Sequence, residues 1–180
     1  MKLYHGTIVD KIQVLKRNSR DKEKSVLYLT DNRAYSLFYI RDPKVNFVTC
    51  GVGEDGKVYY DEKFPNQLEV LYKGTSGYIY ETDVQAQKHH VCGIWLCNTD
   101  AWVSGVEYIP DVYQSIMEEI KAGNVVFTSY DMLTSEQKQM NHQGIVDYLH
   151  RNILTTAQKA FYSNYFPKEW EEVQLENPLA

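Results

Sequence analysis

One stretch near the N-terminus, residues 26–40, constrains the fold more than any other part of the chain. Residues 26–29 form a short apolar run that is typical of a strand, and a helical pattern follows at once. Thr30 or Asp31 stands at the junction, where a side-chain oxygen can cap the first free backbone N–H groups of the helix. Four side chains at three- and four-residue spacing predict one buried helical face: Ala34, Leu37, Phe38 and Arg41.

Two tyrosines suggest that this stretch also binds a ligand. Tyr28 ends the predicted strand, and Tyr39 lies eleven residues further along the chain. A strand end and the following helix can hold two such rings facing one another across a slot. Ring faces stack on flat ligands and attract cations, so the slot suits a flat cationic ligand. The alternative is that both tyrosines simply pack in the core.

The chain opens with a predicted strand, residues 1–7, that ends in His-Gly-Thr. A glycine at that point lets a ligand approach the backbone closely. Tyr-His-Gly-Thr at 4–7, Leu-Tyr-Leu-Thr-Asp at 27–31 and Ser-Leu-Phe-Tyr at 36–39 together resemble the ADP-ribosyltransferase superfamily. The similarity is to its His-Tyr-Glu branch, which holds diphtheria-type toxins and poly-ADP-ribose polymerases. The resemblance covers residues 1–40 and extends to 77–111, and it implies an α+β fold with a split antiparallel β core and flanking helices.

The resemblance also implies that NAD is the substrate. Tyr28 and Tyr39 would sandwich the nicotinamide ring. The backbone of Gly6 would bind the carboxamide group, with Ser36 as its second partner. The residues that the resemblance assigns to NAD binding are His5, Gly6, Thr7, Tyr28, Ser36 and Tyr39.

A glutamate on a late strand completes the catalytic set of this family. A fixed carboxylate there stabilises an oxocarbenium-like transition state more than the ground state. Glu107, in Glu-Tyr-Ile at 107–109, resembles that residue, so catalysis is assigned to Glu107, His5 and Tyr28. His5 would hydrogen-bond the adenine-side or the nicotinamide-side ribose, and Thr7 would lie close to the adenosine end. Three other glutamates remain alternatives: Glu69, Glu81 and Glu118.

A cluster of histidines and cysteines invites a metal site, but its spacing does not support one. Its members are His89, His90, Cys92 and Cys97. This spacing fits no regular zinc pattern. The segment 91–97 instead predicts an apolar strand with buried structural cysteines, so no metal is expected.

Length and composition bound the class of protein. The chain has 180 residues, 43% of them hydrophobic, which predicts one domain over residues 1–180. The net charge of −5 argues against nonspecific binding to nucleic acid, so the expected acceptor is a protein. No apolar run reaches membrane-spanning length, and three cysteines make no disulfide framework. The expected location is therefore the cytoplasm, without a membrane partner.

Turn and capping residues predict the remaining elements. The β core should occupy about residues 1–130, and C-terminal helices that pack on this core should occupy about 134–166. A hairpin turn is expected at Asp55-Gly56, and a helix is expected between Asp111 and Gly123. The other expected segments are an irregular connection at 63–77, strands at 77–83, 102–111 and 125–127, helices at 134–152 and 156–166, and a partly ordered tail at 167–180.

By resemblance, the chain is expected to be an NAD-dependent mono-ADP-ribosyltransferase. It would modify a macromolecular target and release nicotinamide, as a small toxin-like enzyme. One alternative is a catalytically inactive module on the same fold that binds a ligand or a protein partner. Another is an NAD-dependent RNA 2′-phosphotransferase, which needs a pair of basic residues that the sequence does not place.

Overall fold

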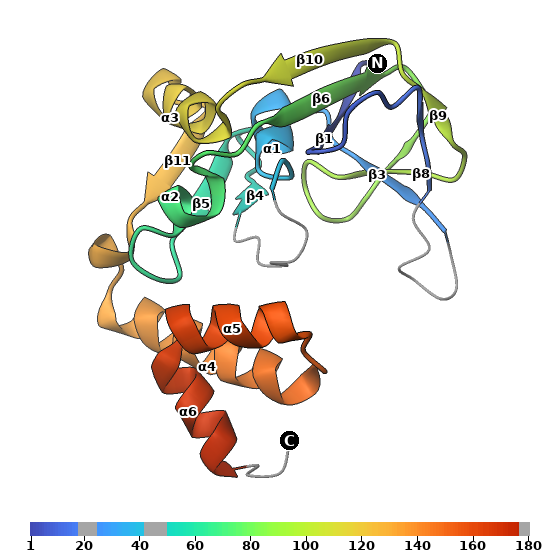
Figure 1. Cartoon of the computed structure of the whole chain (residues 1–180). Coiled ribbons are helices and arrows are strands. Elements are labelled where there is room, and N and C mark those ends of the chain that lie inside the picture. The colour runs from blue at the N-terminus through green and yellow to red at the C-terminus, as the bar shows by residue number, and fades with distance from the viewer. Residues whose placement is uncertain (18–24, 42–49, 177–180) are drawn as a thin grey trace. The chain divides into compact units, whose positions relative to one another are not determined.

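The computed structural model describes residues 1–17, 25–41 and 50–176. These residues form a mixed α+β structure with small antiparallel sheets and six α-helices, and they confirm the α+β class (Figure 1). They divide into two compact units. Unit 1 comprises residues 1–17, 25–41, 50–60 and 68–127. Unit 2 comprises residues 61–67 and 128–176. The expected single domain over 1–180 stays a prediction.

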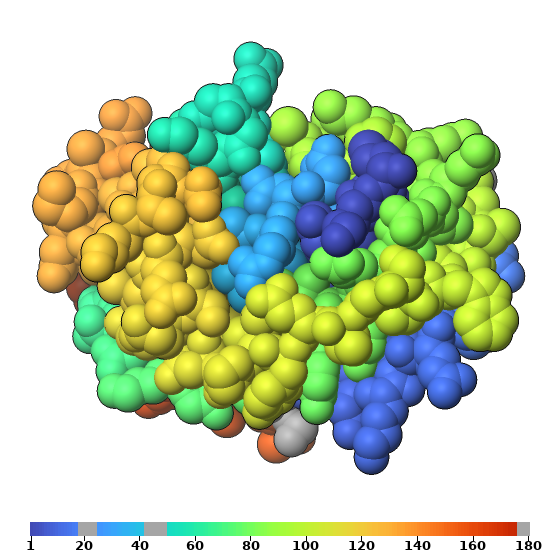
Figure 2. All heavy atoms as spheres, turned by 90° about the horizontal axis from the view of Figure 1, so that it is seen from above, coloured from blue at the N-terminus to red at the C-terminus, as the bar shows by residue number. Residues whose placement is uncertain are grey.

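The longest strands of unit 1 form one antiparallel sheet. They are β1 (Leu3–Thr7), β6 (Gly77–Thr82) and β10 (Gly105–Ile109), with β6 in the middle. The register places Gly6, Ile79 and Glu107 directly opposite one another in one row. Directly opposite residues share a face of the sheet, so Glu107 lies on the same face as Gly6. Strand β10 lies at the edge of this sheet, and its side chains form part of the molecular surface (Figure 2).

A second sheet carries the strand that was predicted to hold the first tyrosine. Its strands are β3 (Leu27–Leu29), β8 (Trp95–Cys97) and β7 (Gln87–Lys88), with β8 in the middle. The strand predicted at 91–97 is thus confirmed only for its last three residues. Beyond β3, Thr30 forms an isolated bridge to Tyr4 of β1. Each of these two residues donates its backbone N–H to the carbonyl of the other, at 2.7 and 3.0 Å.

Helix α1 (Arg33–Leu37) follows this bridge, as the strand-to-helix pattern predicts. The predicted cap at Thr30 or Asp31 is wrong. The capping residue is Asn32, whose side-chain oxygen accepts a hydrogen bond from the Tyr35 N–H at 3.0 Å. Thr30 stands two residues too early and accepts the Asn32 N–H in a tight turn instead.

The apolar face of α1 packs into the main core of unit 1. Ala34, Leu37 and Phe38 are buried, which confirms the predicted stripe, whereas Arg41 is only partly buried. The helix itself is five residues long and ends earlier than the stripe predicts. Its partners in the core come from other elements: Tyr60, Tyr72, Ile79, Ile109, Val112 and Ile116.

Most of the remaining elements of unit 1 follow the sequence signals, with two exceptions. The strand expected at 102–111 is divided, because one strand ends at Trp102 and β10 begins only at Gly105. The hairpin of β4 (Cys50–Val52) and β5 (Val58–Asp61) turns at Gly56, which has a φ of 78°. Helix α3 (Val112–Ala122) begins at the Asp111 cap and ends at Gly123 in the left-handed conformation, as predicted. Segment 63–77 is not irregular, because it contains helix α2 (Gln67–Tyr72). The short strands β2 (Val14–Leu15), β9 (Ala101–Trp102) and β11 (Val125–Thr128) complete the list.

Unit 2 is helical. A turn of 3₁₀ helix at Tyr130–Met132 precedes α4 (Ser135–Arg151), α5 (Thr156–Tyr165) and α6 (Pro167–Glu176). Capping boxes at Thr134 and Thr155 start α4 and α5, and the first of them was predicted. The tail expected from residue 167 is wrong up to residue 176, because α6 forms there and packs on α4 and α5. The packing of these helices on the β core stays a prediction.

None of the helices in the described part of the chain has the length and the apolar character needed to cross a membrane.

The corrected cap of α1 can be tested by substitution. Asn32→Ala should lower the free energy of unfolding by about 1–2 kcal/mol, since the side chain both caps α1 and donates to the Gly56 carbonyl at 2.7 Å. Asp31→Ala, at the exposed neighbouring position, should stay within about 0.5 kcal/mol of the unaltered protein. Urea unfolding measures both, and an equal loss for the two variants would contradict this assignment.

Candidate functional site

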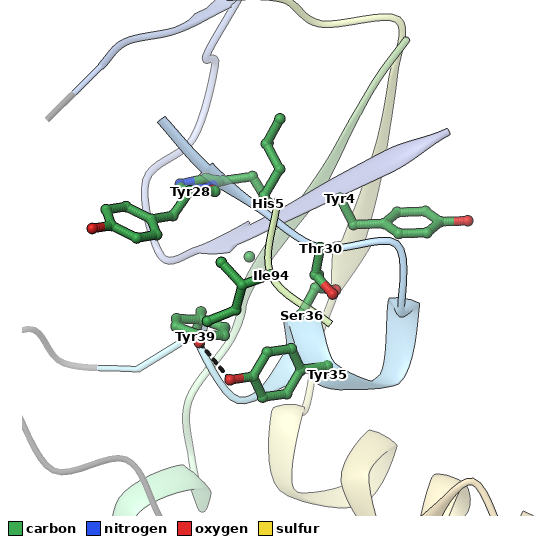
Figure 3. A pocket seen from close by; sticks show the side chains of 10 residues that line it. Tyr4, His5, Tyr28, Thr30, Tyr35, Ser36, Tyr39 and Ile94 are labelled. Atoms are coloured by element: carbon green, nitrogen blue, oxygen red, sulfur yellow. Dashed lines mark hydrogen bonds between the residues drawn. The ribbon is translucent and has the colours of Figure 1, made fainter. Parts of the chain in front are cut away.

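A cavity of about 90 Å³ opens between β1, β3 and α1 (Figure 3). It contains the larger part of the predicted NAD-binding set. Five of the six predicted residues line it: His5, Gly6, Tyr28, Ser36 and Tyr39. The other lining residues are Tyr4, Leu29, Thr30, Tyr35 and Ile94. The sixth predicted residue, Thr7, lies outside this lining, and its hydroxyl accepts the Val9 N–H at 3.2 Å.

The cavity lies where β1 and β3 diverge. Backbone groups of Tyr4 point toward Thr30, and backbone direction alternates from one residue to the next along a strand. The N–H and C=O of Gly6 therefore point to the same side of β1, past the end of the bridge. A ligand in the cavity can thus meet a backbone donor and a backbone acceptor on one residue, which is the pair that a carboxamide requires.

Gly6 packs so closely against α1 that no other residue fits. A Cβ atom built at Gly6 would lie 1.9 Å from the carbonyl oxygen of Ser36. Ser36 is fully buried, and its hydroxyl donates to the Arg33 carbonyl at 2.6 Å. Because the hydroxyl hydrogen is used in this bond, the lone pairs of the Ser36 oxygen remain available to accept a hydrogen bond from a ligand amide.

His5 is held in one orientation by β3. Its Nδ1 donates a hydrogen bond to the Tyr28 carbonyl at 3.2 Å, because a carbonyl oxygen can only accept. Burial lowers the pKa of His5, while the bond to Tyr28 opposes that effect. The imidazole is therefore neutral at pH 7. With the hydrogen on Nδ1, Nε2 can accept a hydrogen bond, such as one from a sugar hydroxyl.

The two predicted tyrosines lie at the rim of the cavity rather than in the core. Tyr28 is 47% exposed and Tyr39 is 39% exposed, which argues against the alternative that both are core residues. The Ile94 side chain, from the loop before β8, also lines the cavity (Figure 3). Nothing in the local sequence around Ile94 points to a role in this site.

A further tyrosine on α1 was missed although a signal was present. Tyr35 lies one helical turn before Tyr39, and side chains at this spacing are neighbours on a helix. The Tyr39 hydroxyl donates to the Tyr35 hydroxyl at 2.9 Å. Burial raises the pKa of both phenols, so both are neutral hydrogen-bonding groups at pH 7.

Glu107, the predicted catalytic glutamate, does not line the cavity. Its carboxylate receives two hydrogen bonds from Arg33, from Nε at 2.9 Å and from Nη2 at 2.5 Å. The third arm of the guanidinium, Nη1, donates to Glu119 at 2.8 Å. Because Arg33 and Glu107 are 37% and 43% exposed, we assign this ion pair only about 0.2–1 kcal/mol of stability. The guanidinium nevertheless places a positive charge directly beside the carboxylate that the resemblance selects for catalysis.

The alternative glutamates have partners of their own. Glu69 pairs with Lys73 and Glu81 with Lys2, at 2.5 and 2.8 Å. Glu118 accepts a hydrogen bond from the Gln114 side chain. Within the described residues, none of these carboxylates lines the cavity.

The cysteine and histidine cluster does not assemble. Cys97 is buried, with its thiol within hydrogen-bonding distance of two backbone carbonyls, whereas Cys92 is only partly buried and donates to the Gly53 carbonyl. His89 accepts the Val91 N–H. In the parts of the chain that the structure describes, no three His, Cys, Asp or Glu side chains come together as metal ligands would.

No family model matches the chain, and the comparisons with curated proteins and with solved structures gave no match either.

The close contact at Gly6 generates a second prediction. Gly6→Ala should destabilise unit 1 by about 2 kcal/mol or more, because the new methyl group would overlap the backbone of α1. Gly51→Ala is the matched control, since it also lies in a strand but its Cβ would meet no atom within 4 Å. Urea unfolding measures the free energy of unfolding of the two variants. Equal stability would contradict the prediction, because it would show that α1 can shift to accommodate the methyl group without cost.

Proposed function

We propose that the chain binds NAD with its nicotinamide end in the His5 cavity and transfers the ADP-ribose group to a macromolecule. The bond between the nicotinamide nitrogen and C1′ of the ribose breaks, and its electron pair stays with nicotinamide, which leaves. A nucleophilic atom of the acceptor forms the new bond to C1′ and loses its proton. NAD is thus a substrate, consumed in each turnover.

One observation carries this proposal: five residues that the family resemblance selects, from three separate segments, line a single cavity. His5 and Gly6 come from β1, Tyr28 from β3, and Ser36 and Tyr39 from α1 and the turn after it. Their chemistry suits the proposed ligand. The Gly6 backbone and the Ser36 oxygen can bind the carboxamide, the neutral His5 can accept from a ribose hydroxyl, and the tyrosine rings can stack on the nicotinamide ring.

The acceptor is proposed to be a protein. The net charge of −5 gives the chain no general attraction for nucleic acid, whose binding depends on neutralising phosphates with Lys and Arg. An RNA 2′-phosphotransferase activity has less support, because His5 provides the only basic side chain among the described residues that line the cavity.

A second candidate function, an inactive ligand-binding module, is favoured by the position of Glu107. The glutamate lies on the same face of the sheet as Gly6 but outside the cavity lining. Its carboxylate is held by two hydrogen bonds from Arg33. In such a module, NAD or a related nucleotide would bind without losing nicotinamide. The two candidates share the cavity and differ only in turnover.

Binding and turnover can be measured separately. Calorimetry should detect NAD binding by the unaltered protein, and Tyr28→Ala should weaken it about 5- to 100-fold by removing one stacking ring. Tyr59→Ala is the control, because Tyr59 has a similar exposure of 44% and lies outside the cavity. No binding of NAD at several millimolar would overturn the proposal.

The enzyme and the inactive module are then distinguished by nicotinamide release. In an enzyme, Glu107→Gln should reduce release about 100-fold or more while NAD affinity stays within about threefold, because the charge acts mainly on the transition state. Glu54→Gln, at an exposed position outside the cavity lining, should leave release unchanged. Binding without any release, in the presence of candidate acceptor proteins, would leave the inactive module.

A further inference from the structure

The hydrogen bond between the Tyr35 and Tyr39 hydroxyl groups joins a buried core side chain to a partly exposed one. Tyr35 is 3% exposed and belongs to the main core cluster of unit 1, whereas Tyr39 is 39% exposed at the rim. Their hydroxyl groups lie 2.9 Å apart, and their rings meet edge to face with centroids 5.2 Å apart (Figure 3). The partly exposed ring is therefore tied to the core at its far end.

This tie determines how the Tyr39 ring can turn. A tyrosine ring at a surface can occupy several rotamers, and a hydrogen bond at its tip selects one of them. The bond joins two neutral groups, because burial raises the pKa of both phenols. It therefore persists throughout the neutral pH range, and it also gives the Tyr39 hydroxyl a hydrogen-bond partner at the rim of the cavity.

We propose that Tyr35 is a positioning residue for the ligand in this cavity. It holds the Tyr39 ring in the orientation that stacks on a flat aromatic amide, without itself having to touch the ligand. This inference rests on the proposed function, in which that ligand is the nicotinamide end of NAD. Tyr28, on the opposite side, contributes its ring and its backbone carbonyl but has no tie of this kind in the described structure.

The proposal predicts different roles for the hydroxyl groups of three tyrosines. Removal of the Tyr35 hydroxyl or of the Tyr39 hydroxyl breaks the same bond and frees the Tyr39 ring. Tyr72→Phe removes a buried hydroxyl bond to the Phe38 carbonyl and leaves the bond between Tyr35 and Tyr39 intact. A purely structural role for Tyr35 would instead affect stability in each state of the protein and leave ligand affinity unchanged.

The experiment is a calorimetric titration of NAD, and of free nicotinamide, into four variants and the unaltered protein. The variants are Tyr35→Phe, Tyr39→Phe, the double substitution and Tyr72→Phe. Tyr72→Phe is the matched control, since it removes a buried phenol bond to the Phe38 carbonyl that lies outside the cavity. Thermal unfolding of each variant verifies that it is folded at the titration temperature.

Tyr35→Phe and Tyr39→Phe should each weaken binding about 3- to 10-fold, and the double substitution should weaken it no further, because one bond is lost in all three. Tyr72→Phe should bind as the unaltered protein does. Unchanged affinity in Tyr35→Phe, or independent losses that multiply in the double variant, would overturn this inference while the proposed function stands. No NAD binding by the unaltered protein would overturn the proposed function, and this inference with it.

Discussion

The backbone bridge between Tyr4 and Thr30 fixes the geometry of unit 1 at the point where a ligand can enter. At this point the residue after β3 is bonded to β1, and beyond it β1 stays with β6 while β3 stays with β8. Helix α1 begins three residues after Thr30, so it must lie across the opening. The contact between Gly6 and the Ser36 carbonyl then closes the floor of the cavity. The divergence of two strands thus creates both the space and the unpaired backbone groups that a polar, flat ligand needs.

Binding and catalysis are not equally supported by this arrangement. The cavity offers stacking rings, a backbone donor and acceptor, and a neutral imidazole, all of which recognise a ligand without a charge on the protein. Stabilisation of an oxocarbenium ion requires in addition a negative charge close to the ribose. The candidate from the family resemblance, Glu107, is paired with Arg33, which also pairs with Glu119. Transfer of ADP-ribose therefore requires that this carboxylate act on the ribose despite its pairing with Arg33.

Local signals in the sequence predict local structure well and the assembled site in part. The strand at 27–29, the hairpin at Gly56 and the helix from Asp111 to Gly123 depend on caps, turns and short-range patterns, which the sequence displays directly. The grouping of His5 with Tyr28 and Ser36 came from a resemblance, since no periodic pattern relates residues on separate elements. The partner of Glu107 was not predictable, because Arg33 lies 74 positions away and meets it only through the packing of α1 beside β10. Ile94 lines the cavity because tertiary packing brings its loop there, and its neighbours in the sequence show no pattern that predicts this position.

The most direct test of the central claim, that the divergence of β1 and β3 forms a ligand site, is an NMR titration of isotope-labelled protein with nicotinamide. The account predicts that the amide resonances of Gly6, Thr30 and Ser36 shift first and most, with smaller changes along β1 and α1. Resonances of unit 2, in residues 135–176, should not move. An absence of shifts at millimolar nicotinamide, or shifts concentrated in the helices of unit 2, would contradict it.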